Sequence, residues 1–351
     1  MAAVKAQGIE CPFIREGDDL ARIVEDSIAI ASRDNLFSLK DKDIIGITES
    51  VVARAYGRYI TVDDIAKSIL SIFGTNEHII LVNPIYSRNR FSMILRGIAR
   101  AASSITIVMP PFDEVGNPSG ENPFTGIDIK KYYETICREE QCLISFVEDT
   151  KEVFRHENVK VLYCGLHNYE NYRIPYQSSG DIVCTLADIC KDVSPDFGVL
   201  GTNKADGERL KLYPSKGLCQ EFCKVVQHRL KERFNADVIV CIYGDGCFKD
   251  PVGGIWEFAD PITMPGYTNP EYIEGTPNEV KLKFVIDEGL TDDEIKDIIR
   301  KHKSADRDKT RNVSLGTTPR ICRDLLASLM DLISGSGDRK TPVVLVQGYF
   351  D

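Results

Sequence analysis

The chain has 351 residues, of which 43% are hydrophobic and 27% are charged, and these fractions exclude a disordered chain, a collagen-like fibre and a coiled coil. The formal net charge of −10 argues against a protein that binds a nucleic-acid backbone, because such a protein needs a basic face. No run of about 18 apolar residues occurs, and the N-terminal stretch lacks the apolar segment of a signal peptide. We therefore expect a cytoplasmic protein with neither a membrane nor a nucleic-acid partner.

Hydrophobic periodicity predicts helices and strands in alternation, which is the pattern of an α/β (mixed α+β) protein. Apolar residues at helical spacing follow an Asp-rich start in 18–33, and a short buried strand follows at 40–48. The stretch that begins at Thr61 opens like a capping box and ends at Gly74, which predicts a helix. The next elements are a strand at 78–82, an amphipathic helix at 87–103, a strand at 104–110 and a Pro- and Gly-rich loop at 110–126.

The second half of the chain continues the alternation with less regular signals. Residues 127–148 predict a helix with a candidate strand after it, and 193–214 form a turn-rich segment. The other predicted elements are short strand-like segments at 159–166 and 182–190, helices at 215–234, 291–302 and 318–333, and strands at 236–243 and 342–348.

The eleven cysteines are an odd number and are scattered through apolar segments, so we expect most of them to be reduced and buried. Cys219 and Cys223 lie one helical turn apart, but no histidine or cysteine cluster completes a zinc site around them. Neither a G-x-S-x-G nor a G-x-G-x-x-G motif occurs, which argues against serine hydrolysis and against hydride transfer on a Rossmann-type domain.

The loop after the strand at 236–243 is a first candidate site, because ligands in parallel sheets bind beyond the carboxyl ends of strands. Asp245 and Asp250 follow this strand closely, and a carboxylate there could hold Mg²⁺ or Mn²⁺. The alternative is a Gly-Asp-Gly turn with a solvated aspartate.

The segment 334–341, SGSGDRKT, is a second candidate. It is not a Walker loop, because it is one residue too short, has Arg339 where glycine is required and runs from a helix to a strand. Backbone amides beside Arg339, Lys340 and Thr341 could still hold phosphate. The alternative is a glycine-terminated helix with a flexible connection.

Two further segments carry charge near predicted element ends. Glu49, Ser50, Arg54 and Arg58 lie in the predicted turn at 48–58, where a solvated amphipathic turn is the alternative. The SRNR sequence at 87–90 would suit a carboxylate or phosphate, or would simply add surface charge.

Five segments in this order resemble the coenzyme F-420 gamma-glutamyl ligases. They are CPFIREGDDLARIV, KDKDIIGITESVVARAYGR, FGVLGTNKADGERLKLYP, ADVIVCIYGDGCFKDPVGG and LMDLISGSGDRKTPVVLVQG. The resemblance implies a discontinuous ligase-like core of residues 1–83 and 193–351, with 84–192 as an insertion or second subdomain.

The resemblance also implies a function. Members of that family join an amino acid to a substrate carboxylate with GTP (or ATP) and a divalent metal, Mg²⁺ or Mn²⁺, and act as homodimers. The implied mechanism activates the carboxylate as an acyl phosphate, which the α-amine of the amino acid, expected to be L-glutamate, then attacks. The site must position and neutralise its ligands rather than supply a nucleophile.

Carried over by position, the resemblance assigns nucleotide binding to several segments. Arg54 replaces a phosphate-facing lysine of the family, which keeps the charge but changes its geometry. The implied nucleotide-binding residues are Cys11, Pro12, Phe13, Ile14, Glu49, Ser50, Arg54, Asn203, Ser334, Gly335, Ser336, Gly337, Asp338, Arg339, Lys340 and Thr341.

The metal ligands of the family are replaced. Their positions align with Leu200, with Tyr243 and Gly244, and with Ser336, none of which supplies a carboxylate. The metal site could be rebuilt by Asp245 and Asp250, or by Asp113 and Glu114. We predict Asp245 as the metal ligand, and Asp245 and Asp250 as the catalytic residues. Two alternatives stay open, namely a catalytically altered or inactive protein that binds a nucleotide or metabolite, and a phosphate-handling hydrolase that uses Asp245 and Asp250.

Overall fold

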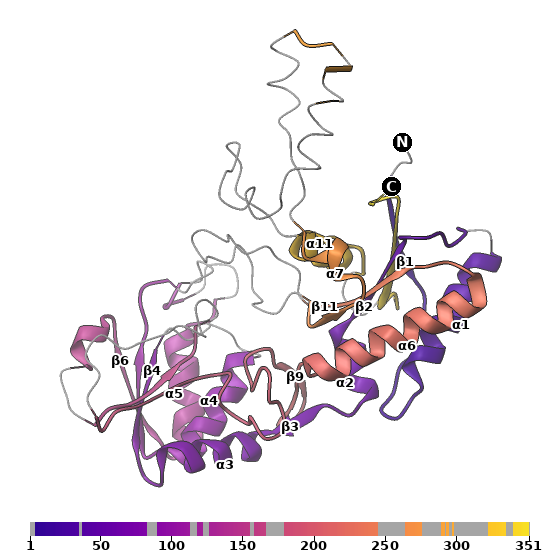
Figure 1. The fold of residues 1–351 in the computed structure, drawn as a ribbon. Coiled ribbons are helices and arrows are strands. Elements are labelled where there is room, and N and C mark those ends of the chain that lie inside the picture. Colours follow the sequence, from indigo (N-terminus) through magenta and orange to yellow (C-terminus); the bar gives the residue numbers. More distant parts are fainter. Residues whose placement is uncertain are drawn as a thin grey trace.

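In the part of the chain that it describes, the computed structural model has three sheets, of five, three and five strands (Figure 1). The second sheet is a small antiparallel one, whereas the third is parallel throughout. The residues that the structure describes are 4–34, 37–82, 90–112, 118–121, 126–154, 158–165, 179–244, 264–275, 289–291, 293–294, 297, 322–334 and 340–350.

The first sheet has the strand order β1-β13-β2-β11-β12. Strands β2 and β11 run parallel to each other, and the other neighbours are antiparallel. Its strands are β1 (Lys5–Ile9), β2 (Ile44–Thr48), β11 (Ile239–Tyr243), β12 (Gly266–Tyr267) and β13 (Val343–Gln347).

Both faces of this sheet are buried, which explains why its central strands are continuous apolar runs. Alternate side chains point to opposite faces, so Ile45 and Ile47 pack with one cluster while Ile44 packs with another. The first face is covered by α1 (Leu20–Arg33), α2 (Glu49–Ala55) and α6 (Lys216–Phe234), and the second by α7 (Pro270–Ile273) and α11 (Cys322–Ser334).

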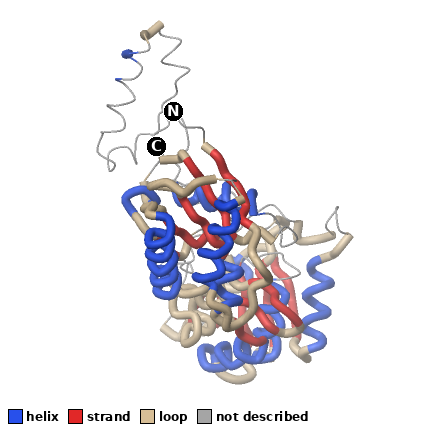
Figure 2. Tube along the Cα trace, turned by 90° about the vertical axis from the view of Figure 1, so that its right-hand side faces the viewer, coloured by secondary structure: helices blue, strands red, loops and turns tan. Residues whose placement is uncertain are grey.

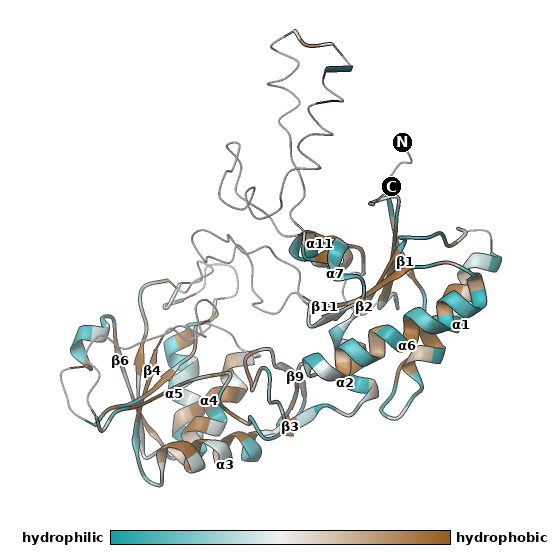
Figure 3. Ribbon diagram, viewed as in Figure 1, coloured by the Kyte–Doolittle hydropathy of each residue, from teal (hydrophilic) through white to brown (hydrophobic). Residues whose placement is uncertain are grey.

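The helices on the first face are amphipathic. In Figure 3, the long front helix α6 carries both hydrophilic and hydrophobic residues, beside the more uniformly hydrophobic strands β2 and β11. Val24 and Ile28 of α1 and Val226 and Leu230 of α6 all belong to the buried cluster beneath. Burial of this apolar stripe holds both helices on the sheet.

The second sheet is a three-stranded antiparallel one with the order β3-β10-β9. Strand β3 (Tyr59–Thr61) leads directly into a helix, whereas β9 (Asn203–Asp206) and β10 (Arg209–Lys211) form a hairpin. The sheet therefore joins residues near the start of the chain to residues beyond 200.

The third sheet is parallel, with the order β6-β5-β4-β7-β8, and helices α3, α4 and α5 pack on one face of it (Figures 1 and 2). A short 3-10 helix, Thr150–Glu152, follows β6. The elements are α3 (Val62–Phe73), β4 (His78–Val82), α4 (Arg90–Ala101), β5 (Ser104–Val108), α5 (Ile129–Glu139), β6 (Leu143–Val147), β7 (Lys160–Tyr163) and β8 (Ile182–Thr185).

Helix α3 begins as the sequence predicts. The Thr61 hydroxyl accepts from the N–H of Asp64 at 3.2 Å, and the Asp64 carboxylate accepts from the N–H of Thr61 at 2.9 Å. This reciprocal capping box satisfies donors that the first turn would otherwise leave unpaired, and Gly74, with φ at +93°, ends the helix.

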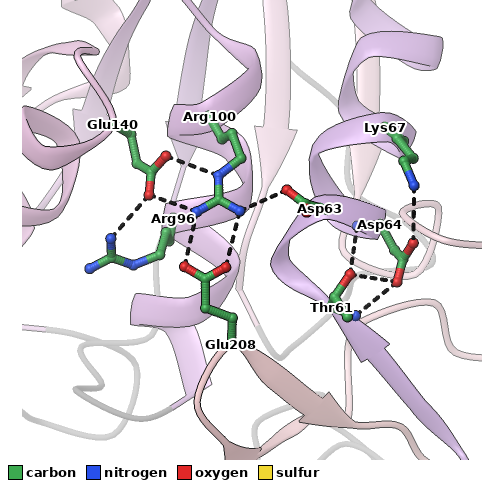
Figure 4. A network of polar contacts seen from close by, with 8 residues as sticks. All are labelled: Thr61, Asp63, Asp64, Lys67, Arg96, Arg100, Glu140 and Glu208. Carbon is green, nitrogen blue, oxygen red and sulfur yellow. Dashed lines mark hydrogen bonds and ion pairs between the residues drawn. The ribbon is translucent and has the colours of Figure 1, made fainter.

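Arg100 of α4 is the centre of an ion-pair network (Figure 4). Its guanidinium donates to Glu140 at 2.9 Å, to Glu208 at 3.0 Å and to Asp63 at 2.7 Å, and Arg96 also pairs with Glu140. Since Glu208 lies in the turn of the β9–β10 hairpin, this network fastens the second sheet to the helices of the third.

Several local predictions differ from the structure. Residues 48–58 contain helix α2 rather than a turn, because Thr48 caps the first turn by accepting from the N–H of Ser50. The turn-rich segment 193–214 contains the β9–β10 hairpin, and β1 is an additional strand. Strand β4, which we assigned to the core range 1–83, pairs with strands of the range 84–192. The division into a core and an insertion stays a prediction.

The ten cysteines in the described part of the chain are all free and buried, which agrees with their prediction as small core residues. Within the same residues, no helix is long and apolar enough to cross a membrane.

Candidate functional site

Strand register brings three distant segments to one edge of the first sheet. Ile9 at the end of β1 pairs with Val343 at the start of β13, and Val343 pairs with Ile47 near the end of β2. Because β11 is parallel to β2, with Tyr243 opposite Thr48, β11 ends at the same edge. The segments 11–14, 48–54 and 340–342 therefore leave the sheet side by side.

Backbone hydrogen bonds fix these segments to one another. The N–H of Cys11 donates to the carbonyl of Lys340 at 2.9 Å, and the N–H of Thr48 donates to the carbonyl of Pro342 at 3.0 Å. The Thr341 hydroxyl donates to the carbonyl of Ser334 at 3.0 Å, which ties the end of α11 to the start of β13. Hydrogen bonds thus connect four segments of the chain at this edge, namely those that contain Cys11, Thr48, Ser334 and residues 340–342.

A cavity of about 360 Å³ opens at this edge. Its size is within the range of small-molecule sites in proteins. Its lining residues are Cys11, Pro12, Phe13, Ile14, Thr48, Glu49, Ser50, Val51, Arg54, Lys211, Asp331, Ser334, Lys340, Thr341 and Pro342.

The deeper part of the lining combines apolar and polar groups. Ile14, Glu49 and Ser334 are buried, so a carboxylate and a hydroxyl lie beside hydrocarbon. Burial raises the pKa of the Cys11 thiol to about 11, so this sulfur stays protonated at neutral pH and is not a ready nucleophile. The cavity thus offers polar binding groups rather than an activated thiol.

Three cationic side chains line the cavity, and within the described residues none of them forms an ion pair with a carboxylate. Arg54 is exposed, Lys340 holds its Nζ 4.7 Å from the centre of the Phe13 ring, and Lys211 donates from Nζ to the hydroxyl of Ser50. Against them stand two carboxylates in the lining, Glu49 and Asp331. The charge excess favours an anionic ligand.

Most of the described residues predicted to bind nucleotide line this one cavity. The structure brings together Cys11, Pro12, Phe13, Ile14, Glu49, Ser50, Arg54, Ser334, Lys340 and Thr341. Asn203 is not among the lining residues. Its backbone pairs with that of Lys211, and Lys211 does line the cavity. Arg58 lies elsewhere, where it donates to the carbonyl of Val193. The predicted residues Asp113, Glu114, Asp245, Asp250, Gly335, Ser336, Gly337, Asp338 and Arg339, and residues 87–89 of the SRNR segment, lie outside the described residues.

Sequence reasoning missed five lining residues, namely Thr48, Val51, Lys211, Asp331 and Pro342. Thr48, Val51 and Pro342 are neighbours of predicted residues. Lys211 had a usable signal, because buried Leu210 and Leu212 flank it in the alternation of a strand. Because we predicted a turn-rich segment at 193–214, the alternation was not interpreted as a strand.

The comparison with known families decides what kind of protein this site belongs to. The sequence model of the F420-0:gamma-glutamyl ligase family matches residues 8–348, almost the whole chain. The chain belongs to this family. No curated protein matches it. The predicted resemblance and the mixed α/β fold are therefore confirmed, and membership in the F420-0:gamma-glutamyl ligase family places the chain among ligases that form γ-glutamyl bonds.

The divalent metal that this ligase family implies requires several oxygen ligands. Leu200, at one position where the resemblance places a metal-binding aspartate, is fully buried in an apolar cluster. Tyr243, at another, is buried, and burial raises the pKa of its phenol, which opposes the phenolate form. In the portion of the chain that the structure describes, no group of three acidic, histidine or cysteine side chains could hold a metal ion. The described donors do not fit a metal site by themselves.

Proposed function

We propose that this family member is a nucleotide-dependent ligase that forms an amide bond between an amino acid, L-glutamate, and a small carboxylated metabolite. GTP or ATP is the proposed nucleotide. The observation that carries the proposal is the convergence of residues 11–14, 48–54, 331–334 and 340–342 on one cavity with an excess of cationic side chains. A polyphosphate is an anionic ligand that these cationic side chains could hold through charge-assisted hydrogen bonds.

The proposed reaction has two steps. A carboxylate oxygen of the acceptor attacks the terminal phosphorus, and the nucleoside diphosphate leaves, which gives an acyl phosphate. The amine of L-glutamate then attacks the acyl carbon, inorganic phosphate leaves and the amine nitrogen loses a proton. Arg54 would offset phosphate charge near the cavity mouth, and the exposed Phe13 ring would offer an apolar face beside it.

A requirement for Mg²⁺ or Mn²⁺ stays a prediction. Asp245 and Asp250 remain the proposed metal-binding and catalytic residues, outside the described part of the chain. Calorimetric titration of GTP in the presence and absence of MgCl₂, with EDTA as the control, tests the requirement directly.

The experiment that tests the proposed reaction is an assay of phosphate release with product detection by mass spectrometry. We expect phosphate release only when nucleotide, L-glutamate and a suitable carboxylated metabolite from a panel are present together. We also expect a new product in which an amide bond joins the carboxylate of that metabolite to the nitrogen of glutamate. Release with nucleotide alone, unchanged by amino acid, would instead support the phosphate-handling hydrolase.

A second candidate function is a protein that binds the nucleotide or a metabolite without ligation. The buried Leu200 favours it, because a leucine cannot replace a metal-binding carboxylate. Ligand bound to the purified protein, with no phosphate release across a panel of amino acids, would support this function. Metal-dependent phosphate release would exclude it.

We also infer a homodimer in the cytoplasm whose partners are small molecules, with neither nucleic acid nor membrane among them. The family supports small-molecule substrates. Sedimentation equilibrium tests the dimer, and a monomer at all concentrations would contradict it.

A further inference from the structure

Lys211 enters the cavity from the second sheet, whereas Arg54 lies on helix α2 and Lys340 precedes β13. It is the last residue of β10 in the second sheet, and its neighbours Leu210 and Leu212 are buried in the core of the parallel-sheet region. Because successive side chains of a strand alternate, Lys211 points away from that core, and it lines the cavity at the edge of the first sheet.

The ammonium of Lys211 has donors to spare. A lysine ammonium carries three N–H donors, and the structure shows one of them on the hydroxyl of Ser50. Among the described residues, Lys211 has the Ser50 hydroxyl as its partner and forms no ion pair with a carboxylate, although its side chain is half-buried. A half-buried cation with free donors beside a cavity is suited to an anion.

The hairpin that carries Lys211 is held firmly in place. Its turn residue Glu208 accepts from Arg100 through both carboxylate oxygens, at 3.0 and 3.1 Å, as Figure 4 shows. The carbonyl of Glu208 accepts from the N–H of Val62, and the N–H of Leu212 donates to the carbonyl of Arg58. Lys211 therefore lies on a strand whose position is fixed by hydrogen bonds and ion pairs. This lowers the conformational entropy that is lost when the backbone around Lys211 is ordered by a ligand.

We propose that Lys211 is an anion-binding residue of this cavity that contacts a phosphate group of the bound nucleotide, together with Ser50. The inference rests on the proposed function for the identity of the ligand, but the phosphate contact itself is tested separately below. In this account the ammonium keeps its hydrogen bond to Ser50 and donates its remaining N–H groups to phosphate oxygens.

The test compares wild type, Lys211→Met, Lys211→Arg and a matched control, Lys224→Met, in calorimetric titrations with GTP and with inorganic tripolyphosphate. Lys224 is an exposed lysine of α6 that pairs with Glu221. We expect Lys211→Met to weaken the binding of both ligands about 10- to 100-fold, because hydrogen bonds to charged groups contribute about 1.5–3 kcal/mol. Lys211→Arg should retain most of the affinity, and Lys224→Met should retain all of it.

The outcomes separate this inference from the proposed function. If wild type and Lys211→Met bind GTP equally tightly, Lys211 does not contact the nucleotide phosphate, and the inference is wrong although the cavity binds nucleotide. If wild type binds tripolyphosphate through Lys211 but binds no nucleotide, the phosphate contact stands and the nucleotide function fails. Binding of neither ligand to wild type overturns both.

A second measurement on the wild-type protein covers the case in which Lys211→Met does not fold. Acetylation by acetic anhydride, read by peptide mass spectrometry, should slow several-fold at Lys211 when tripolyphosphate is present, whereas Lys224 should react at the same rate. Equal acetylation of Lys211 with and without tripolyphosphate would overturn the inference.

Discussion

The N–H of Cys11 donates to the carbonyl of Lys340 at 2.9 Å, and this bond joins the first and the last segments of the cavity. It continues the antiparallel pairing of β1 with β13, whose last pair is Ile9 with Val343. The wall of the cavity is therefore an extension of a hydrogen-bonded sheet. Such a wall keeps its shape without a ligand. This favours binding, because little conformational entropy of the wall is lost when the ligand binds.

Gly46 in β2 tests how tightly this sheet is packed. A Cβ on Gly46 would overlap the sulfur of Met330 on α11, so the buried Met330 side chain would have to shift. We expect Gly46→Ala to lower the free energy of unfolding by about 1–3 kcal/mol, the usual cost of overpacking a core. Urea denaturation measures it.

Gly217 is the matched control for that substitution. It lies in helix α6, and a Cβ there would meet nothing within 4 Å. Gly217→Ala should therefore stabilise the protein, by up to about 1 kcal/mol, since alanine has the higher helix propensity. Equal effects at the two glycines would contradict the packing of α11 on β2.

The capping box of α3 gives a second prediction. Thr61→Ala removes the hydroxyl that accepts from the N–H of Asp64, so we expect a loss of about 1 kcal/mol in the free energy of unfolding. Thr135→Ala in α5 is the control, because that exposed hydroxyl caps no helix: it donates to the carbonyl of Lys131 one turn earlier and accepts from Arg138 at 3.5 Å. It should change stability by less than about 0.5 kcal/mol. A Thr61→Ala protein as stable as wild type would show that the cap is not formed in solution.

Much of this fold could be predicted from the sequence, because its signals are local. The capping box at Thr61 and the apolar runs of β2, β11 and β13 identify their elements without tertiary information. Helix α2 was missed because it is only two turns long and depends on the Thr48 cap. Strand β1, with the sequence KAQGI, lacks clear alternation and exists because β13 offers it an edge.

Local patterns pointed to segments 48–58 and 334–341 as candidate sites, but only the family resemblance predicted that they belong to one site. No spacing in the sequence shows that Cys11 and Lys340 are neighbours, because their contact depends on the pairing of β1 with β13. Lys211 was missed for the same reason, since the contact of β10 with the cavity depends on a second sheet. Long-range strand pairing carries this information, and local periodicity does not.

The network around Arg100 predicts a pH-dependent contribution to stability. Hydrogen bonds from Arg100 and Arg96 hold the pKa of Glu140 below its usual value of 4.5. A carboxyl with a lowered pKa stabilises the fold above its unfolded pKa, and that stabilisation is lost as the pH falls through the folded pKa. Glu140→Gln should cost about 1–3 kcal/mol at pH 7, since it leaves two arginines without their shared partner.

The difference between Glu140→Gln and wild type should shrink as the pH is lowered from 5 to 3, measured by thermal unfolding at each pH. Glu221→Gln is the control, because the Glu221–Lys224 pair is exposed and should contribute less than about 1 kcal/mol. A constant difference across this pH range would contradict the role of the ionised Glu140.

The buried thiols predict a loss of stability in alkali. Burial raises the pKa of Cys11 to about 11 and that of Cys190 and Cys241 to about 12, above the ordinary value of 9.0. Above pH 9 the unfolded chain loses thiol protons that the folded chain keeps, so rising pH favours unfolding. Between its unfolded and its folded pKa, each such thiol lowers the free energy of unfolding by up to about 1.4 kcal/mol per pH unit.

We expect the free energy of unfolding to fall steeply between pH 9 and pH 10.5 in reducing buffer. Cys241→Ala removes one fully buried thiol and should make this fall shallower by about 1 kcal/mol per pH unit. An identical slope in the two proteins would show that Cys241 does not contribute to the alkaline transition.

The most direct test of the central claim, that this cavity binds a nucleoside triphosphate, is calorimetric titration of wild type, Arg54→Ala and Arg22→Ala with GTP and ATP. Arg54 lines the cavity, whereas Arg22 is an exposed arginine of α1. The account predicts saturable binding to wild type, about 10-fold weaker binding or worse to Arg54→Ala, and unchanged binding to Arg22→Ala. Absence of binding to wild type at millimolar nucleotide, or equal affinity of all three proteins, would contradict it.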